Sequence, residues 1–189
     1  TFERRWEDNP VHGTYYPPAG TTKVIYKEGL FVGYRGYEKN SIKPLFPFGY
    51  GLSYTTFKYA NLAIKPADSS IKSEELSAPL YQVTFDVTNT GSREGADVAQ
   101  VYVGDPHSRV ARPAKELKGF SRVNLKPGET KTVTVVLDGR AFSYYDVDGK
   151  QWRADPDEYQ ILVGRSSQDI QLRGTLNLPA GAATSASNK

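Results

Sequence analysis

The sequence predicts a mainly β fold, an immunoglobulin-like β-sandwich of about seven or eight strands. Thirteen Tyr and eight Phe occur together with abundant Val and Thr, and 17 Gly and 12 Pro interrupt them. This composition is typical of strands broken by turns rather than of long helices. Short alternations of apolar and polar residues then recur from Ser53 to Leu178. With 189 residues, the chain has room for one sizeable core and a shorter additional piece.

The strands are predicted from this alternation in chain order. Between Tyr81 and Val87, apolar side chains occupy every second position, which predicts a strand with one buried face. Between Asp97 and Val103 the sequence is more continuously apolar, which predicts a central strand covered on both faces. The predicted strands of this region are 54–65, 81–87, 97–103, 117–123, 132–137, 142–147, 151–153, 159–163 and 170–178.

Turn residues separate these strands. Pro127-Gly128 predicts a turn, because Pro fixes φ near −65° and Gly accepts a positive φ. Asp148-Gly149 predicts a tight hairpin, because both residues tolerate a positive φ. Residues 66–79 form a predicted polar loop, and residues 179–189, mostly Ala, Ser, Gly and Thr, form a predicted disordered tail.

The first 52 residues have a different character. Only residues 23–26 and 30–34 fit short strands there, which is too little alternation for an independent core. The segment is nevertheless aromatic, so we expect it to be buried against something else and to be the end of a neighbouring domain. We therefore divide the chain into 1–52, a sandwich domain at 53–178 and the tail. The aromatic residues of the first segment are Phe2, Trp6, Tyr15, Tyr16, Tyr26, Phe31, Tyr34, Tyr37, Phe46, Phe48 and Tyr50.

Composition excludes several classes of function. The formal net charge is only +3 and is spread along the chain, so we expect no nucleic-acid partner. The absence of Cys removes disulfides, thiolate nucleophiles and thiolate metal sites. No run approaches the roughly 18 apolar residues of a membrane span, so we expect no membrane partner. The absence of any Met predicts that the chain is a fragment or a processed product.

No motif predicts catalysis, a metal or a cofactor. His12 and His107 are isolated from each other, which argues against a zinc site. Gly49-Tyr50-Gly51 is interpreted as a turn rather than an anion-binding loop. The densest acidic cluster lacks the spacing of a calcium loop, and neighbouring acids on a strand point to opposite faces, so we predict neither a calcium site nor a catalytic dyad. This cluster contains Asp146, Asp148, Asp155, Asp157 and Glu158.

Two tryptophans are weak candidates for stacking on sugar rings. Trp152 follows the predicted hairpin turn, and packing within that hairpin is the favoured interpretation. Trp6 lies in the first segment, where docking against an absent domain is favoured. The Tyr15-Tyr16 pair of the same segment is a further candidate for stacking, and docking is again the favoured interpretation.

Several ordered motifs resemble one known family. The run LFPFGYGLSYTTF at 45–57 closely resembles the hallmark that joins the second catalytic-region domain of family three glycoside hydrolases to their fibronectin type III-like domain. Upstream, EGLFVGYR at 28–35 is similar to the stretch that precedes this hallmark. The segments RPAKELKGF at 112–120, LKPGET at 125–130 and FSYYD at 142–146 are similar to markers inside that domain.

The resemblance implies a fold, a parent reaction and a location. It implies a fibronectin type III-like sandwich preceded by a remnant of an α/β sandwich domain at 1–52. The parent would be a retaining β-glucosidase or related exo-acting β-glycosidase, with an Asp nucleophile in an N-terminal barrel and a Glu acid/base in the α/β domain. No residue of this sequence matches either position, so no catalytic residue is assigned. Such enzymes are commonly exported, which predicts a secreted or periplasmic protein.

Three hypotheses of function follow. The leading one is a non-catalytic C-terminal portion of a β-glucosidase that covers apolar surface on the catalytic domains and positions them, and that is inactive alone. The second is a β-sandwich module that binds a polysaccharide or another polymer through its aromatic residues. The third is one chain of a nicked, two-chain active glycosidase. The expected partners are thus catalytic domains, in cis or as a separate chain, with a polysaccharide as the alternative.

Overall fold

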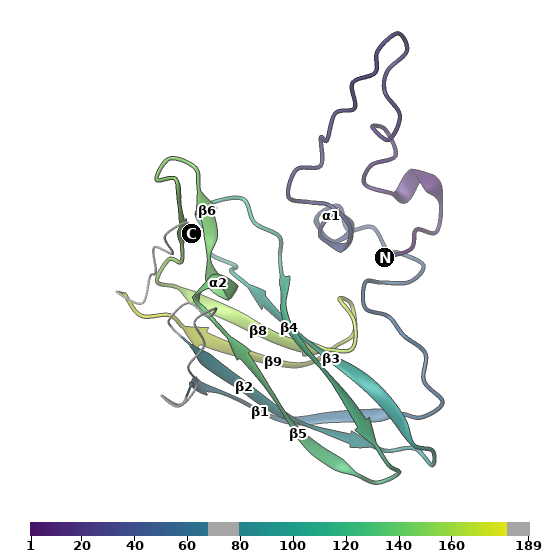
Figure 1. The fold of residues 1–189 in the computed structure, drawn as a ribbon, viewed down its shortest axis with the longest axis vertical. Coiled ribbons are helices and arrows are strands. Elements are labelled where there is room, and N and C mark those ends of the chain that lie inside the picture. The colour runs from purple at the N-terminus through teal and green to yellow at the C-terminus, as the bar shows by residue number, and fades with distance from the viewer. Residues whose placement is uncertain (68–79, 181–189) are drawn as a thin grey trace.

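The computed structural model describes residues 1–67 and 80–180 and contains a sandwich of two antiparallel sheets. The three-stranded sheet has the order β1-β2-β5 and the four-stranded sheet the order β4-β3-β8-β9 (Figure 1). A separate hairpin pairs β6 with β7. The strands are β1 (Phe57–Pro66), β2 (Tyr81–Asn89), β3 (Gly95–Gly104), β4 (Glu116–Leu125), β5 (Thr130–Leu137), β6 (Tyr144–Asp146), β7 (Gln151–Arg153), β8 (Glu158–Gly164) and β9 (Ile170–Asn177).

Helices are few and short among the described residues. They are the 3-10 helix η1 (Trp6–Asp8), α1 (Tyr34–Lys39) and α2 (Gly139–Phe142). The predicted mainly β sandwich is therefore confirmed, and its two facing sheets hold seven strands.

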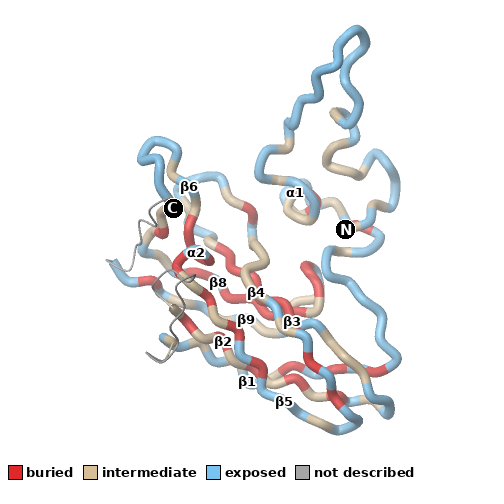
Figure 2. The backbone as a smooth tube through the Cα atoms, viewed as in Figure 1, coloured by how far each residue is buried: buried red, intermediate tan, exposed pale blue. Residues whose placement is uncertain are grey.

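The core lies between the two sheets, where Figure 2 shows most of the buried residues. Strand β2 alternates as predicted, so Val83, Phe85 and Val87 are fully buried on its inner face. Across the sandwich, Val101 of β3 and Ile161 of β8 belong to the same cluster. Burial of each such side chain stabilises the fold by about 1.5–3 kcal/mol, so alternating apolar positions determine which face of each strand points inward.

From Ala99 to Gly104, strand β3 is covered on both faces, as its continuous apolar pattern predicts. Ala99 and Val101 face the core. Gln100 and Tyr102 alternate with them and are also buried, at 3% and 0% exposure. The residues that cover this outer face come from the first segment, which crosses it before entering β1 (Figure 1).

Two predicted strands of the first segment are wrong. Residues 23–26 have no regular structure, and residues 30–34 contain a turn that leads into α1. The physical reason is that no neighbouring strand pairs with them in the described chain, and Val24, Ile25 and Tyr26 remain exposed. The predicted strand 142–147 also starts too early, because Phe142 is the last residue of α2. The Asp138 carboxylate caps the first turn of this helix by accepting a hydrogen bond of 3.2 Å from the Ala141 N–H.

The predicted turns are confirmed in position. Gly128 has φ +75°, and the Glu129 N–H donates to the Lys126 carbonyl at 3.0 Å across the Pro-Gly turn. The hairpin at Asp148-Gly149 also forms, but its left-handed residue is Lys150, with φ +51°. Residues 68–79 of the predicted loop and 181–189 of the predicted tail lie outside the described residues, and the division of the chain at 52 and 178 stays a prediction.

Candidate docking surface

Exposed apolar side chains are concentrated in the first 54 residues. Among the described residues, 15 of the 20 large hydrophobic side chains that are exposed lie there. A soluble chain rarely leaves such a set uncovered, and contiguous apolar surface of this kind marks a site of interaction. Figure 2 shows the same segment as mostly exposed backbone standing away from the sandwich. We call this set the first-segment surface: Phe2, Trp6, Tyr15, Tyr16, Val24, Ile25, Tyr26, Leu30, Val32, Leu45, Phe46, Phe48, Tyr50, Leu52 and Tyr54.

The N-terminus returns beside the linker that leads into the sandwich. The Phe2 N–H donates to the Phe46 carbonyl at 2.8 Å, and the Leu45 N–H donates to the Phe2 carbonyl at 2.8 Å. The two Phe rings meet edge to face at 6.3 Å. These contacts join the two ends of the first segment.

A groove of about 500 Å³ opens between the N-terminal residues and α1. Its walls are mainly apolar and include Pro10, Val11, Val32, Tyr34 and Tyr37. Concave apolar surface of this kind accommodates an inserted side chain or loop of a partner. The groove thus adds a recess to the first-segment surface.

Aromatic packing holds the first segment on the sandwich. The Tyr34 ring stacks on Phe48 at 5.0 Å and meets the edge of Tyr102 at 6.1 Å. The Tyr34 hydroxyl also accepts a hydrogen bond of 2.9 Å from the Leu117 N–H of β4. Burial under this cluster raises the pKa of Tyr102 well above its ordinary value. The sheet therefore provides a rigid base for the surface above it.

An ionic joint lies beside this packing. Arg35 of α1 reaches Glu116 at 3.1 Å, and Lys115 pairs with Glu38, also of α1. Burial opposes ionisation of Glu116, but the charges of Lys118, Arg35 and a further arginine outweigh it and hold its pKa below the ordinary value. The residues of the predicted RPAKELKGF marker thus fix α1 to the edge of β4.

The predicted turn at Gly49 is confirmed, and the structure shows why glycine stands there. Gly49 has φ +79°, and a Cβ at this position would approach the Gln100 amide to 2.3 Å. The Gln100 side chain instead donates to the Gly49 carbonyl at 3.2 Å and to the Arg165 carbonyl at 2.7 Å. The Ser167 N–H donates to the Phe48 carbonyl at 2.8 Å. This network fastens the linker to the sandwich at the hallmark motif.

The structure does not bring the two candidate tryptophans together. Trp6 lies in η1, 40% exposed, with its ring edge against His12 and Tyr15. Trp152 lies in β7 on the far hairpin (Figure 1), where Arg140 covers its ring at 3.9 Å and Tyr145 meets it edge to face. Trp6 is therefore part of the first-segment surface, whereas Trp152 packs within its own hairpin.

The acidic side chains of the predicted cluster have separate partners. Asp157 lies 3.3 Å from His107, and Asp155 accepts from Arg153 at 2.7 Å. Asp146 accepts from two backbone N–H groups of its own turn. Within residues 1–67 and 80–180, no three His, Cys, Asp or Glu side chains gather as metal ligands. No helix there has the length and apolar character needed to cross a membrane.

Asp155 should make the stability of the fold depend on pH. Burial opposes its ionisation, but hydrogen bonds from Arg153 and Tyr144 and the charge of Arg109 hold its pKa below the ordinary value. A lowered carboxyl pKa contributes stability above the unfolded pKa of about 3.9, and this contribution is lost as pH falls through the folded-state pKa. We expect Asp155→Asn to lower the free energy of unfolding by about 1–2 kcal/mol at pH 7.

The difference between the two proteins should begin to shrink below about pH 4, where the carboxyl of the unfolded chain becomes protonated, and should be lost once the pH falls below the lowered folded-state pKa. Urea titrations of both proteins at pH 7 and pH 3.5 measure it. A difference of equal size at both pH values would show that Asp155 acts through packing rather than charge.

Comparison with known proteins identifies the domain and the longer proteins that contain it. A model of the fibronectin type III-like domain family matches residues 97–167. Thermostable β-glucosidase B of Acetivibrio thermocellus is 46% identical over 178 residues, which cover 94% of this chain and 22% of that protein. β-Glucosidase B of Emericella nidulans is 41% identical, with 95% of this chain and 21% of that protein covered. The chain therefore spans about a fifth of the length of these relatives.

Solved structures agree with the sequence relatives. β-Glucosidase 3B from Thermotoga neapolitana, in complex with α-D-glucose, matches with a TM-score of 0.80 at 35% identity over 94% of this chain and 23% of its own. The Bifidobacterium adolescentis GH3 β-glucosidase matches with a TM-score of 0.83 at 36% identity over 94% of this chain and 25% of its own. The chain thus matches the C-terminal region, with its fibronectin type III-like domain, of the family three β-glucosidases.

Proposed function

We propose that this chain is the non-catalytic C-terminal portion of a β-glucosidase, and that it stabilises and positions the catalytic part by docking through the first-segment surface. One observation carries the proposal: most of the exposed large hydrophobic side chains lie in residues 1–54. Tyr34 and Arg35 of α1 hold this surface on the sandwich. A partner docked on the surface is therefore held in a fixed position relative to the sandwich. The parent reaction would be hydrolysis of terminal β-linked glucosides.

The same surface serves whether the catalytic part precedes it in one polypeptide or is a separate chain. Apolar contact contributes on the order of 25 cal/mol per Å² buried, so covering this surface stabilises both parts. The polysaccharide-binding alternative receives less support, because Arg140 lies over the Trp152 ring and occupies a face on which a sugar would stack.

The test combines activity and binding. The purified chain should not hydrolyse an aryl β-glucoside, and it should bind the separately produced polypeptide encoded by the reading frame immediately before Thr1. Tyr26 is 81% exposed, so Tyr26→Glu should weaken that binding about tenfold without unfolding the chain. Turnover by the chain alone would overturn the proposal, as would equal affinities of the native chain and the Tyr26→Glu variant. Calorimetric titration measures the affinities.

A further inference from the structure

The turn of the β6–β7 hairpin contains an Asp-Gly bond for which the proposed function has no use. Asp148 and Gly149 are both exposed there, between the two paired strands. Among the described residues, no donor is bonded to the Asp148 carboxylate, although the Asp148 N–H donates to Asp146. Gly149 has no Cβ to obstruct an approach to its nitrogen. An unengaged carboxyl therefore stands next to an unhindered backbone nitrogen.

The Asp146 carboxylate lies against this nitrogen. Its Oδ1 atom accepts from the Gly149 N–H at 3.2 Å. Glycine allows this approach, since a Cβ at position 149 would lie only 2.9 Å from Oδ2 of Asp146. A carboxylate within hydrogen-bond reach of a proton is placed to act on it as a general base. Because an N–H donates in the plane of its peptide group, this contact leaves unoccupied the face of the nitrogen that would attack a carbonyl carbon.

We propose that Asp148 rearranges spontaneously to isoaspartate, with Asp146 as the base that assists the first step. The Gly149 nitrogen attacks Cγ of the protonated Asp148 carboxyl. Asp146 takes the proton from that nitrogen and returns it to the carboxyl hydroxyl, which leaves as water when its C–O bond breaks. The product is a five-membered succinimide ring. Water then adds to one of the two ring carbonyls: opening at Cγ restores aspartate, and opening at the main-chain carbonyl gives isoaspartate.

The chain contains a second Asp-Gly bond, whose surroundings oppose the same reaction. Asp138 is the N-cap of α2, and its carboxylate accepts from the Ala141 N–H at 3.2 Å. Gly139 is buried as the first residue of that helix, and its carbonyl accepts from the Ser143 hydroxyl at 2.7 Å. Ring closure requires rotation about bonds that these contacts hold. The fold, rather than the dipeptide alone, therefore selects Asp148.

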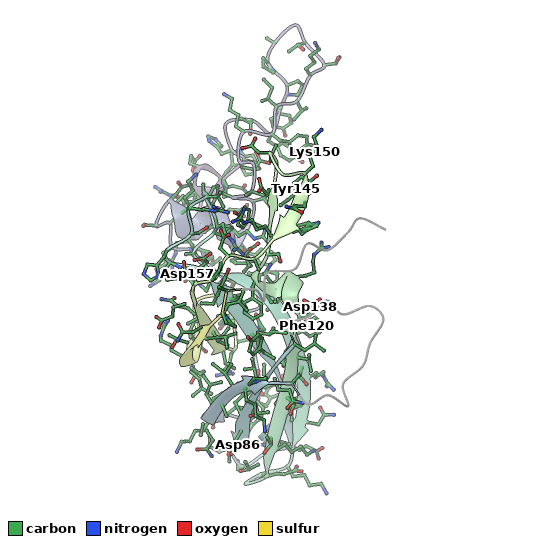
Figure 3. The ribbon with its side chains drawn as sticks, turned by 90° about the vertical axis from the view of Figure 1, so that its left-hand side faces the viewer. Asp86, Phe120, Asp138, Tyr145, Lys150 and Asp157 are labelled. Atoms are coloured by element: carbon green, nitrogen blue, oxygen red, sulfur yellow. The ribbon has the colours of Figure 1, made fainter. Side chains whose placement is uncertain are left out.

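The rearrangement changes the hairpin and not the docking surface. Isoaspartate adds one methylene to the backbone of a turn whose strands pair Tyr145 with Trp152. The edge-to-face contact of these two rings, at 5.7 Å, should therefore loosen. Figure 3 shows Tyr145 and Lys150 on the hairpin, which extends beyond Asp138 along the long axis of the molecule. The hairpin also stands apart from the first segment in Figure 1, so this inference does not rest on the proposed function.

Trypsin separates the two bonds for the test, because cleavage after Lys131, Arg140 and Lys150 gives the peptides 132–140 and 141–150. The native chain is incubated at 37 °C and pH 7 and digested at intervals. Isoaspartate is located by mass spectrometry with electron-transfer fragmentation and is counted with a protein L-isoaspartyl methyltransferase. Synthetic peptides with the same two sequences, incubated in parallel, give the rate of each bond without the fold.

We expect isoaspartate to form at Asp148 about tenfold faster in the folded chain than in its reference peptide, because the fold places the base. At Asp138 it should form more slowly in the folded chain than in its reference peptide. Asp146→Asn should remove the acceleration at Asp148, since an amide is not a base. Asp157→Asn is the matched control and should leave the rate unchanged, because Asp157 contacts His107 rather than the turn.

Equal rates at Asp148 in the folded chain and in the peptide would overturn the proposal. Formation at Asp138 as fast as at Asp148 in the folded chain would also overturn it. An unchanged rate in Asp146→Asn would show that Asp146 is not the base. Urea unfolding midpoints check that the variants fold, and the comparison of the native chain with the two peptides decides without any variant.

Discussion

Replacing Arg112 with methionine is expected to lower the free energy of unfolding by about 3–5 kcal/mol. The Arg112 side chain is only 6% exposed and lies 3.5 Å from Asp105 and 3.3 Å from Glu116. It also donates to the Phe142 carbonyl at 3.0 Å and to the Ser143 carbonyl at 3.4 Å. Methionine preserves much of the volume but leaves the buried Asp105 carboxylate and the partly buried Glu116 carboxylate without this cation, and that loss dominates the effect.

Removal of Arg112 should also affect the docking surface. Glu116 also holds Arg35 of α1, so a rearranged Glu116 would loosen the first segment as well as the sandwich. Burial already raises the pKa of Asp105, and removal of Arg112 should raise it further. A raised carboxyl pKa favours the folded state below the unfolded pKa and loses that contribution as pH rises, so the deficit of the variant should be larger at pH 7 than at pH 4.5.

Urea unfolding at both pH values measures this effect. Arg173→Met is the control, because Arg173 is exposed on β9. The triple variant Arg112→Met, Asp105→Asn, Glu116→Gln should recover part of the loss by removing the uncompensated charges. A deficit below about 1 kcal/mol at pH 7, or one no larger than that of the control, would show that solvent reaches the cluster and replaces the arginine.

The sandwich could be predicted from the sequence because the pattern of apolar residues within a strand indicates which of its faces is buried. In β2, the side chains of Val83, Phe85 and Val87 follow the period of two that a half-buried strand requires, and all are buried. Strand β3 lacks that alternation because its two faces are both covered from Ala99 to Gly104. Local sequence therefore predicts which residues are buried where the apolar pattern of a single strand is enough to show it.

The first segment could be predicted only in outline. Its aromatic content predicts burial against another domain, which stays a prediction, and α1 has six residues, too few to show a helical period. Its position depends on distant partners, since Tyr34 contacts Leu117 and Phe48. The exposure of Phe120 could not be predicted for a similar reason: Phe120 has the residue type of a core strand position, and only the pairing with Gln100 shows that it faces outward.

The ionic joint was also missed, although a signal for it is present. The marker at 112–120 places Arg112, Lys115, Glu116 and Lys118 within seven positions that enter a strand. Charges of both signs so close together in a β-region commonly form a solvated edge, and sequence alone does not distinguish that case from a buried network. Glu38 and Arg35, which complete the joint, are some 80 residues away along the chain.

The second large effect is expected for Asn89→Ala, which should lower the free energy of unfolding by about 3–4 kcal/mol. Asn89 ends β2 and is fully buried. Its amide oxygen accepts from the Thr55 hydroxyl at 2.6 Å and the Gly91 N–H at 3.0 Å, and its amide nitrogen donates to the carbonyls of Arg93 at 2.7 Å and Leu125 at 3.0 Å. Alanine leaves these four groups without their partner, and each unsatisfied buried group costs about 1–3 kcal/mol before local rearrangement or water entry.

The position matters because three segments meet there. Thr55 belongs to the linker that enters β1, Gly91 to the turn after β2, and Leu125 to the end of β4.

Asn89→Asp tests whether hydrogen bonding rather than volume decides the effect, because the carboxylate is nearly the same size but would face two carbonyl oxygens. We expect Asn89→Asp to be at least as destabilising at pH 7 and partly to recover at pH 4, where a buried carboxyl is protonated and can donate. Urea titration measures both variants, and Asn177→Ala, at an exposed position at the end of β9, is the control. If Asn89→Asp were as stable as the native protein at pH 7, the amide donors to Arg93 and Leu125 would be dispensable, and the bonds accepted from Thr55 and Gly91 would account for the effect of Asn89→Ala.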